Sequence, residues 1–377
     1  MVTAGIYIHL PFCATKCMYC DFYSVTDREE SIDRYINALK EEIKQCSVDV
    51  SNWRFDTIFI GGGTPSLLKG SQVGSIISAL EKKYNLSHII EFTLEANPGE
   101  APKENLRDFL SLGINRLSIG VQSLHKEILK FLTRIHNRDD VFKTYQNARE
   151  IGFQNINFDL IYSIPGQTWE MWEEDLNQIY DLDPEHISAY SLTVEKGTEL
   201  FKMVKNKTIS ISNNDDSAFW FENTHHKMKF NGYSPYEISN FSKPGNQCKH
   251  NLHYWETHPY LAFGASANGF DKIHRWKNIH SLDKYINAVE QKKSPISFTE
   301  RLSNIDQINE FIGFGLRMIK GFNINRIPKT LKNQFNDNFL ITKSKYKNCF
   351  RISGNNISLS KNGLLLADEI IPDLLLE

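Results

Sequence analysis

The stretch Tyr7-Ile-His-Leu-Pro-Phe-Cys-Ala-Thr-Lys-Cys-Met-Tyr-Cys-Asp-Phe22 places three cysteines, Cys13, Cys17 and Cys20, directly after a strand-like segment. A C-x3-C-x2-C loop supplies three thiolates to a cubane iron–sulfur cluster and leaves the fourth corner to another ligand. A disulfide would leave one of the three thiols unpaired, and a structural zinc site normally takes four ligands from nearby residues. The spacing therefore favours a cluster with one iron open to a small molecule.

Strand-like and helical segments alternate along the chain around this loop. We expect strands at residues 5–9, 55–60, 91–95, 116–120, 155–161 and 186–192, and helices at 29–46, 72–84, 102–112, 125–150 and 168–180. Such alternation indicates βαβ units with a parallel sheet buried under helices. We therefore predict an α/β fold in the form of a partial (β/α)6 barrel, with ligands at the carboxyl ends of its strands.

Glycine-rich and polar motifs follow the second and third of these strands. Gly61-Gly-Gly-Thr-Pro-Ser66 comes after the second strand, where consecutive glycines let a backbone bend sharply and approach a ligand closely. Glu95 ends the third strand, and its carboxylate can accept hydrogen bonds from an amine or a ribose. Taken alone, each would more often be an ordinary turn or a solvated charge. Their positions relative to the cysteine loop favour a shared site.

The fourth and fifth strands carry further polar side chains. Gln122, at the end of the fourth strand, offers a donor and an acceptor, and Arg134 offers a planar fork suited to a carboxylate. Without other information Arg134 would be interpreted as a surface helix arginine. Asp159 interrupts a mostly apolar strand, and because an isolated buried carboxylate is costly, we expect it to have a partner.

Together these motifs resemble the radical S-adenosylmethionine (SAM) superfamily, and the resemblance runs through most of residues 5–270. In that superfamily three cysteines hold a [4Fe-4S] cluster, whose open iron binds the amine and carboxylate of SAM. An electron from the cluster then cleaves SAM to a 5′-deoxyadenosyl radical. The resemblance implies that Cys13, Cys17 and Cys20 hold the cluster. It implies a SAM site made of Tyr7, the backbone at Gly62, Gly63 and Thr64, and the side chains of Glu95, Gln122, Arg134 and Asp159, with Ser191 or Thr193 as looser matches.

The flanking sequence resembles, more narrowly, the family of the oxygen-independent coproporphyrinogen dehydrogenase HemN and the heme chaperone HemW. HemN-type enzymes carry another cysteine two residues after the third, where this chain has Phe22. They also have a longer segment before the tyrosine, which has only six residues before it here. The run from Cys248 to Trp255, Cys-Lys-His-Asn-Leu-His-Tyr-Trp, resembles the H-N-x-x-Y-W motif of the HemW branch.

The resemblance to the HemW branch implies a heme chaperone that binds a [4Fe-4S] cluster, SAM and heme, and delivers heme to acceptor hemoproteins. The alternative is a HemN-type enzyme that decarboxylates coproporphyrinogen III oxidatively to protoporphyrinogen IX. Neither the acceptor, the electron donor, the oligomeric state nor the cleavage of SAM follows from the sequence. An acceptor in the respiratory chain would bring the protein to a membrane surface.

The Cys248–Trp255 motif also has a physical interpretation of its own. A neutral imidazole can be an axial ligand of heme iron, and aromatic rings can pack on a porphyrin face. With the resemblance, His250 becomes a candidate heme-binding residue, ahead of Cys248. Without it, His250 and His253 would be structural histidines with satisfied hydrogen bonds.

The end of the chain predicts a separate small domain. Basic residues outnumber acidic ones after residue 270, whereas the reverse holds before it, so we place a core at 1–270, a linking region at 271–300 and a C-terminal domain at 301–377. Helices are expected near 304–320, 324–335 and 337–347, then a hairpin over 350–360 and a helix over 361–371. Helices followed by a two-stranded wing indicate a winged-helix-like α+β domain, as in the family.

Composition limits the partners and the location. The chain has 43 Lys and Arg residues against 45 Asp and Glu, so it offers no global attraction to nucleic acid. This balance disfavours a third interpretation, an RNA-modifying enzyme, and the basic bias of the tail indicates a solvated face. We find no signal-peptide pattern and no apolar run long enough to span a bilayer. Six cysteines without a secretory signal fit a reducing compartment, and we expect a cytoplasmic protein.

Overall fold

A twelve-stranded sheet organises most of the chain in the computed structural model, which describes residues 1–211 and 214–377. Its centre consists of six parallel strands that lie side by side in the order in which they occur in the sequence. These strands are β1 (Val2–Leu10), β2 (Trp53–Gly62), β3 (Glu91–Ala96), β4 (Arg116–Gln122), β5 (Asn155–Tyr162) and β6 (His186–Ser191). The predicted α/β alternation is confirmed.

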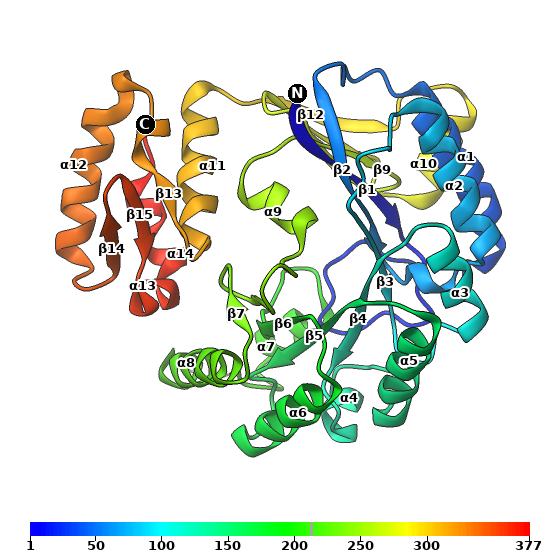
Figure 1. Cartoon of the computed structure of the whole chain (residues 1–377), viewed down its shortest axis with the longest axis horizontal. Coiled ribbons are helices and arrows are strands. Elements are labelled where there is room, and N and C mark those ends of the chain that lie inside the picture. Colours follow the sequence, from blue (N-terminus) through cyan, green and yellow to red (C-terminus); the bar gives the residue numbers. More distant parts are fainter. Residues whose placement is uncertain (212–213) are drawn as a thin grey trace.

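Helices connect these strands and cover the outer face of the sheet (Figure 1). They are α1 (Ile32–Gln45), α2 (Gly70–Lys83), α3 (Lys103–Ser111), α4 (Lys126–Phe131), α5 (Arg138–Ile151) and α6 (Trp169–Leu182). The helix expected over residues 125–150 is two helices. The chain turns at Thr133, which has a φ of 56°, and α5 restarts behind a capping box in which Asn137 and Asp140 each accept the other's backbone N–H.

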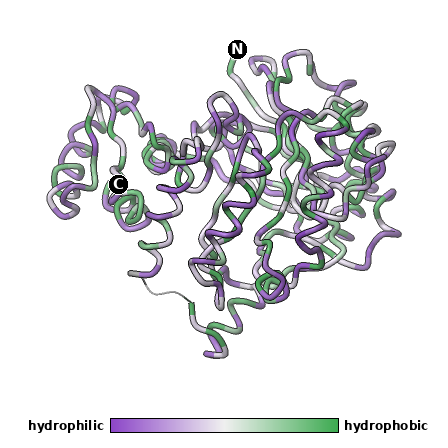
Figure 2. Tube along the Cα trace, turned by 60° about the horizontal axis from the view of Figure 1, so that its bottom comes forward, coloured by the Kyte–Doolittle hydropathy of each residue, from purple (hydrophilic) through white to green (hydrophobic). Residues whose placement is uncertain are grey.

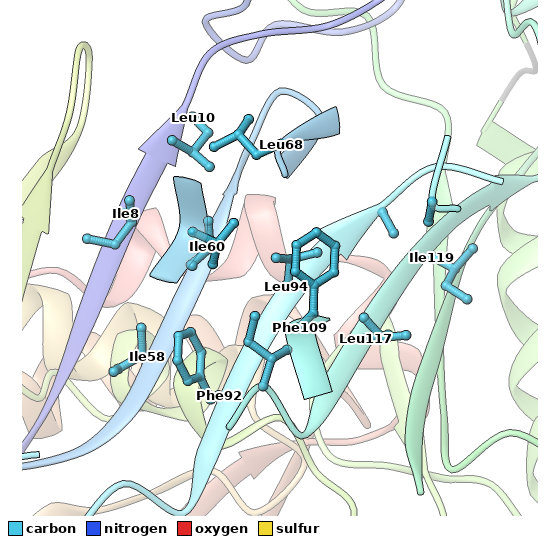
Figure 3. Packing of buried hydrophobic residues seen from close by; sticks show 14 of the residues in the cluster. Ile8, Leu10, Ile58, Ile60, Leu68, Phe92, Leu94, Phe109, Leu117 and Ile119 are labelled. Carbon is cyan, nitrogen blue, oxygen red and sulfur yellow. The ribbon is translucent and has the colours of Figure 1, made fainter. Parts of the chain in front are cut away.

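Side-chain alternation explains why the sheet is buried on one face and polar on the other. In β4, Leu117 and Ile119 are fully buried beneath the helices. They join Ile60, Leu94 and Phe109 in a continuous apolar layer (Figure 3). The residues between them point to the opposite, inner face, because successive side chains of a strand alternate. Polar groups are thereby concentrated inside the curved sheet.

The six parallel strands do not close into a complete barrel. Instead of pairing with each other, β1 pairs with β9 (Tyr260–Phe263) and β6 pairs with β8 (Asn240–Ser242). The outer strands of the sheet are β7 (Ser234–Pro235), β10 (Asn268–Phe270), β11 (His274–Asn278) and β12 (Ile296–Arg301). The remaining helices of this part are α7 (Glu199–Lys205), α8 (Asn214–Phe230), α9 (Lys249–Trp255) and α10 (Leu282–Glu290).

Residues 271–300, which we predicted as a linking region, are folded onto the large sheet. They contain β11, α10 and most of β12; β11 pairs with β10, and α10 packs against α1. Glu42 on α1 accepts hydrogen bonds from the Gly264 N–H (2.8 Å), the Asn278 amide (2.6 Å) and the Tyr285 hydroxyl (2.5 Å). We propose that the boundary of the C-terminal unit lies at the end of β12.

The C-terminal unit has its own core and a small antiparallel sheet. Its elements are α11 (Asn304–Arg317), β13 (Phe322–Asn323), α12 (Lys329–Lys345), β14 (Phe350–Ser353), β15 (Asn356–Leu359), α13 (Lys361–Leu365) and α14 (Ala367–Ile370). The predicted hairpin is present as β14 and β15, but a single helix, α12, replaces the two expected between 324 and 347. Figure 1 shows this unit beside the barrel, with α9 between them.

The helices carry hydrophilic as well as hydrophobic residues (Figure 2). Over the described residues, no helix combines the length and the apolar character needed to cross a membrane.

Candidate functional site at the carboxyl ends of the strands

The cysteine loop leaves β1 at the carboxyl end of the parallel sheet. The Cys13 N–H donates to the carbonyl of Val25 (3.0 Å), and the Val25 N–H donates to the carbonyl of Pro11 (2.7 Å), so the first cysteine is held by a short ladder. Cys17 and Cys20 lie in the loop and are linked by a turn, in which the Cys20 N–H donates to the Cys17 carbonyl (3.2 Å). All three thiols are partly buried and free of disulfides.

Burial and neighbouring sulfurs disfavour ionisation of Cys13 and Cys20 in the protein alone. Burial is the main cause that raises the pKa of Cys13, and it raises that of Cys20 to about 11. Among the described residues, no three His, Cys, Asp or Glu side chains converge tightly enough to hold a single metal ion. A cubane cluster places each cysteine on a different iron, so its ligands need not meet at one point.

The Gly61–Ser66 loop packs directly on the cysteine loop. The Gly63 N–H donates to the Leu10 carbonyl (2.8 Å), and the Thr64 N–H donates to the Phe12 carbonyl (2.7 Å). Gly62 has a φ of +110°, and a Cβ there would lie 2.5 Å from the His9 ring, so only glycine fits. The three N–H groups of Gly62, Gly63 and Thr64 are therefore engaged within the protein, which leaves backbone carbonyls as the groups that an amine would need.

Donors point at two of the three cysteine sulfurs. The Thr64 hydroxyl donates to Cys13 Sγ and Arg134 Nη1 donates to Cys17 Sγ, each over 3.6 Å. Asn97 joins these two donors: its Nδ2 donates to Thr64 Oγ1 (2.9 Å), and its Oδ1 accepts from Arg134 Nη2 (2.7 Å). The Nε of Arg134 is buried and has no partner in the described structure. A guanidinium with a spare buried donor fits an anionic group bound beside the loop.

Tyr7 and Glu95 lie on the inner face of the sheet next to this network. The Tyr7 hydroxyl and His9 Nδ1 are 3.0 Å apart, and His9 Nε2 is 2.8 Å from the Tyr23 carbonyl. Because that carbonyl can only accept, Nε2 carries the proton and Nδ1 accepts from Tyr7. Glu95 Oε2 accepts from the Gly62 N–H (2.9 Å), and burial, reinforced by Asp159, raises the pKa of Glu95 to about 7.

Gln122 and Asp159 complete the inner face. Gln122 is buried with a φ of 65°, and its amide is grouped with Asn97 and Arg134 around Gly120. Asp159 has the partners we expected, since its carboxylate accepts from the Ser118 hydroxyl (2.8 Å) and from Asn157 Nδ2 (3.0 Å). Ser191 is the last residue of β6, and Thr193 is exposed in the loop beyond it.

Two exposed apolar side chains flank the thiols. Phe22, two residues after Cys20, is 64% exposed, and Ile135, next to Arg134, is 62% exposed. Ile135 lines a small recess together with Thr15, Cys17, Asn97, Glu100, Thr133, Arg134 and His136. Exposed apolar surface thus occurs beside Cys17, in this recess, and two residues after Cys20.

The His250 motif lies deeper on the inner face of the sheet, against β1, β2 and the start of β3. Its residues form α9, whose first N–H groups are held by Glu91, the first residue of β3: the N–H groups of Lys249 and His250 each donate to its carboxylate over 2.9 Å. His250 contacts Thr57, five residues before Gly62 on β2, which corresponds to about 16 Å along the strand at ~3.3 Å per residue. The motif therefore lies below the cysteine loop, about halfway along β2, and Phe59 stands between His250 and Tyr7, with ring centroids 5.3 Å and 6.2 Å away.

The geometry of His250 differs from that of an iron ligand. Its side chain is fully buried, Nδ1 is 2.8 Å from Thr57 Oγ1, and Nε2 is 2.9 Å from the Tyr254 hydroxyl. We predicted a heme-binding residue, but the imidazole offers neither an exposed edge nor a free lone pair. His253 is likewise buried, with Nε2 2.7 Å from Asp56. Cys248 is buried as well, and burial raises the pKa of its thiol to about 12.

Asn97 is the site residue that we did not identify from the sequence. It stands in the run Ala96-Asn-Pro-Gly-Glu100, which has the composition of a turn. The available signal was its position directly after β3, where a polar side chain enters the same end of the sheet as Glu95.

Comparisons with known proteins agree with these features. A family model described as "Radical SAM superfamily" matches residues 7–179. The heme chaperone HemW of Bacillus subtilis is 34% identical over 367 residues, with 97% of each chain covered. This chain belongs to the HemW family of radical SAM proteins. HemW of Escherichia coli is 38% identical over 268 residues, which cover 70% of this chain and 69% of that protein.

The family resemblance and the predicted fold class are thereby confirmed. A solved structure of the coproporphyrinogen III oxidase HemN from Escherichia coli, described as a radical SAM enzyme, superposes with a TM-score of 0.85. It covers 99% of this chain and 90% of that chain at 21% identity, so the likeness establishes the fold. The radical SAM family implies a [4Fe-4S] cluster and SAM as its cofactors.

Proposed function

We propose that this protein is a heme chaperone that binds a [4Fe-4S] cluster, SAM and heme, and delivers heme to acceptor hemoproteins. The observation that carries the proposal is the similarity, over 97% of the chain, to a relative named heme chaperone. Phe22 supports it, because HemN-type enzymes have a cysteine at that position.

In this proposal Cys13, Cys17 and Cys20 hold the cluster. The hydroxyl and guanidinium donors aimed at two of the sulfurs fit this assignment, because sulfur becomes a better acceptor when it is a thiolate bound to iron. When bound, the cluster would supply one-electron redox chemistry at this end of the sheet. The protein's own part is to provide three thiolates and to stabilise their charge.

SAM would bind across the same inner face. The carboxylates of Glu95 and Asp159 and the backbone at Gly62, Gly63 and Thr64 provide acceptors, while Gln122 and Arg134 provide donors. Tyr7 lies beside Glu95, and burial followed by the charge of Glu95 raises the pKa of the tyrosine, so its hydroxyl keeps its proton. Acceptors for an amine and donors for a carboxylate thus occur together, as an amino acid ligand requires.

Heme binding in this proposal does not depend on His250 as the iron ligand, because both of its ring nitrogens are hydrogen bonded in a buried position. We assign His250 instead to holding α9 against β2. The exposed side chains of Phe22 and Ile135 offer apolar surface to a flat ligand near the thiols.

The test is anaerobic reconstitution with iron and sulfide followed by titration with heme. We expect iron and sulfide in the ratio of a [4Fe-4S] cluster, and a saturable change in the Soret band. Replacing Cys13, Cys17 and Cys20 by alanine should abolish iron uptake. Cys46→Ala, a partly buried cysteine on the far side of the barrel core, is the matched control and should retain it. Wild-type protein that shows no saturable Soret change would rule out the heme chaperone.

The second candidate is oxidative decarboxylation of coproporphyrinogen III, and the structural likeness to HemN motivates it. An anaerobic assay with this substrate, SAM and a reductant distinguishes the two. A heme chaperone forms no protoporphyrinogen IX, whereas formation of this product with two SAM molecules consumed per product, one for each decarboxylated propionate, would favour the enzyme.

A further inference from the structure

We propose that Asn97 is a positioning residue that holds two hydrogen-bond donors on the sulfurs of the cluster cysteines. The inference rests on the [4Fe-4S] cluster of the proposed function and is independent of heme. Its basis is one unbroken chain of contacts from Cys13 to Cys17 that passes through Thr64, Asn97 and Arg134.

Every polar atom of the Asn97 amide is used in this chain. Nδ2 donates to Thr64 Oγ1 over 2.9 Å and to Glu100 Oε2 over 2.6 Å, while Oδ1 accepts from Arg134 Nη2 over 2.7 Å. A rotated amide would place its NH2 against Arg134, which can only donate, and its oxygen against Glu100, which as a carboxylate can only accept. The surroundings therefore fix one orientation of the amide.

This orientation decides where the Thr64 proton points. A hydroxyl has one proton, and because Asn97 donates to Oγ1, that proton is free to be directed at Cys13 Sγ, 3.6 Å away. An acceptor at position 97 would compete with the sulfur for the same proton.

The orientation of Arg134 follows the same logic. Its Nη2 is held by Asn97 Oδ1 and by the Gly120 carbonyl, 2.6 Å away, which turns Nη1 toward Cys17 Sγ. The guanidinium is planar, so fixing one amino group fixes the direction of the other. Asn97 acts on both sulfurs without contacting either.

Hydrogen bonds to cluster sulfurs are one of the factors that set the reduction potential. The reduced cluster carries more negative charge on sulfur, so donors stabilise the reduced state and raise the potential. Loss of the Asn97 amide should therefore shift the midpoint potential to a more negative value. Misplacement of Arg134 should also weaken SAM binding about tenfold, the effect expected for one hydrogen bond to a charged group.

The test compares Asn97→Leu, which preserves side-chain size, with the matched control Asn105→Leu. Asn105 lies on α3 and donates to the Leu68 carbonyl (3.2 Å), away from the thiols. Both proteins are reconstituted anaerobically, and the midpoint potential is measured by redox titration followed by electron paramagnetic resonance. We expect a negative shift for Asn97→Leu and none for Asn105→Leu. An unchanged potential in Asn97→Leu, or an equal shift in the control, would overturn the proposal.

Thr64→Val provides a second variant that keeps the side-chain shape and removes only the hydroxyl donor. It should shift the potential in the same direction, and Asn97→Leu added to it should shift the potential by less than in the wild-type background, because part of its effect runs through Thr64. Fully additive shifts would overturn the relay through Thr64. A wild-type protein that assembles no cluster would refute the proposed cofactor instead, and a normal cluster without heme binding would refute only the chaperone.

Discussion

His250→Ala separates a structural role of this histidine from a role in heme ligation. The substitution removes a fully buried ring that touches Phe59, with ring centroids 5.3 Å apart. It also removes the hydrogen-bond partners of the Thr57 and Tyr254 hydroxyls. All of these contacts stabilise α9 against the sheet, so their loss should appear as a loss of folding stability.

The expected loss of folding stability is the sum of a cavity and of two lost hydrogen bonds. Truncation of a fully buried ring to alanine leaves a cavity, for which about 3 kcal/mol is a conservative value. The hydroxyls of Thr57 and Tyr254 lose their partner, and together they add about 1 kcal/mol to the loss of stability when water replaces part of the lost hydrogen bonding. The sum, about 4 kcal/mol, is a large part of the stability of an ordinary domain and corresponds to a fall in Tm of about 6 °C for a unit of about 300 residues.

The assay pairs thermal and denaturant unfolding with heme titration of the reconstituted protein. Thr57→Val is the matched control because it breaks one of the same hydrogen bonds and retains the imidazole; we expect a loss of about 1 to 2 kcal/mol. Both variants should bind heme as the wild type does. A His250→Ala protein of wild-type stability that no longer gives a saturable Soret change would refute this reasoning and make His250 the ligand.

Three further predictions concern other parts of the chain. Burial raises the pKa of Glu42 from 4.5 to about 7, so the folded state binds more protons than the unfolded state between these values. Stability should therefore fall by about 3 kcal/mol as pH rises from about 4.5 to 7, and Glu42→Gln should flatten this dependence in denaturant unfolding. Gly62→Ala should prevent iron uptake on reconstitution, because its Cβ would lie 2.5 Å from the His9 ring. Trp255→Ala should expose the connection after β12 to limited proteolysis, because Trp255 packs on Phe314 of α11 with ring centroids 6.0 Å apart.

Each of these predictions has a clear contrary result. A Glu42→Gln protein that keeps the wild-type pH profile would show that another group titrates in this range. Gly62→Ala with normal iron content would show that the glycine loop can move away from the cysteine loop. Unchanged proteolysis of Trp255→Ala would mean that two ion pairs, Lys320 with Glu256 and Arg275 with Glu310, suffice to hold the barrel and the C-terminal unit together.

The hydrophobic periodicity of the sequence was sufficient to predict the barrel strands and the position of the cysteine loop after β1, because both depend on local order. The break between α4 and α5 was missed, although Asn137 and Asp140 have the spacing of a capping box. The fold of residues 271–300 was missed for a different reason. We took the change in charge balance near residue 270 as a boundary. The Ile-Ser-Phe-Thr run of β12 nevertheless alternates as a strand does, even though all six residues of β12 are exposed in the structure.

The sequence was less informative about how the site residues are joined. The roles carried over to Glu95, Arg134 and Asp159 remain predictions, although the structure gathers these residues at one end of the sheet. Asn97 was hidden in a turn-like run, because composition does not distinguish a turn from a side chain that links two others. For His250, the motif specifies a residue type at a position, whereas its burial against β2 and its hydrogen bond to Thr57 depend on a strand nearly two hundred residues away.

The pairing of β1 with β9 has a consequence for biosynthesis. The strand that leads into the cysteine loop is synthesised long before its partner strand, because Gly5 to Ile8 pair with residues 260–263. The backbone of Leu282 also donates to the Tyr23 hydroxyl just after the loop, over 2.6 Å. Contacts so distant in sequence form late and slowly. The three thiols therefore reach their final arrangement only after residue 282 has been translated, and insertion of the proposed cluster is expected to be a late event.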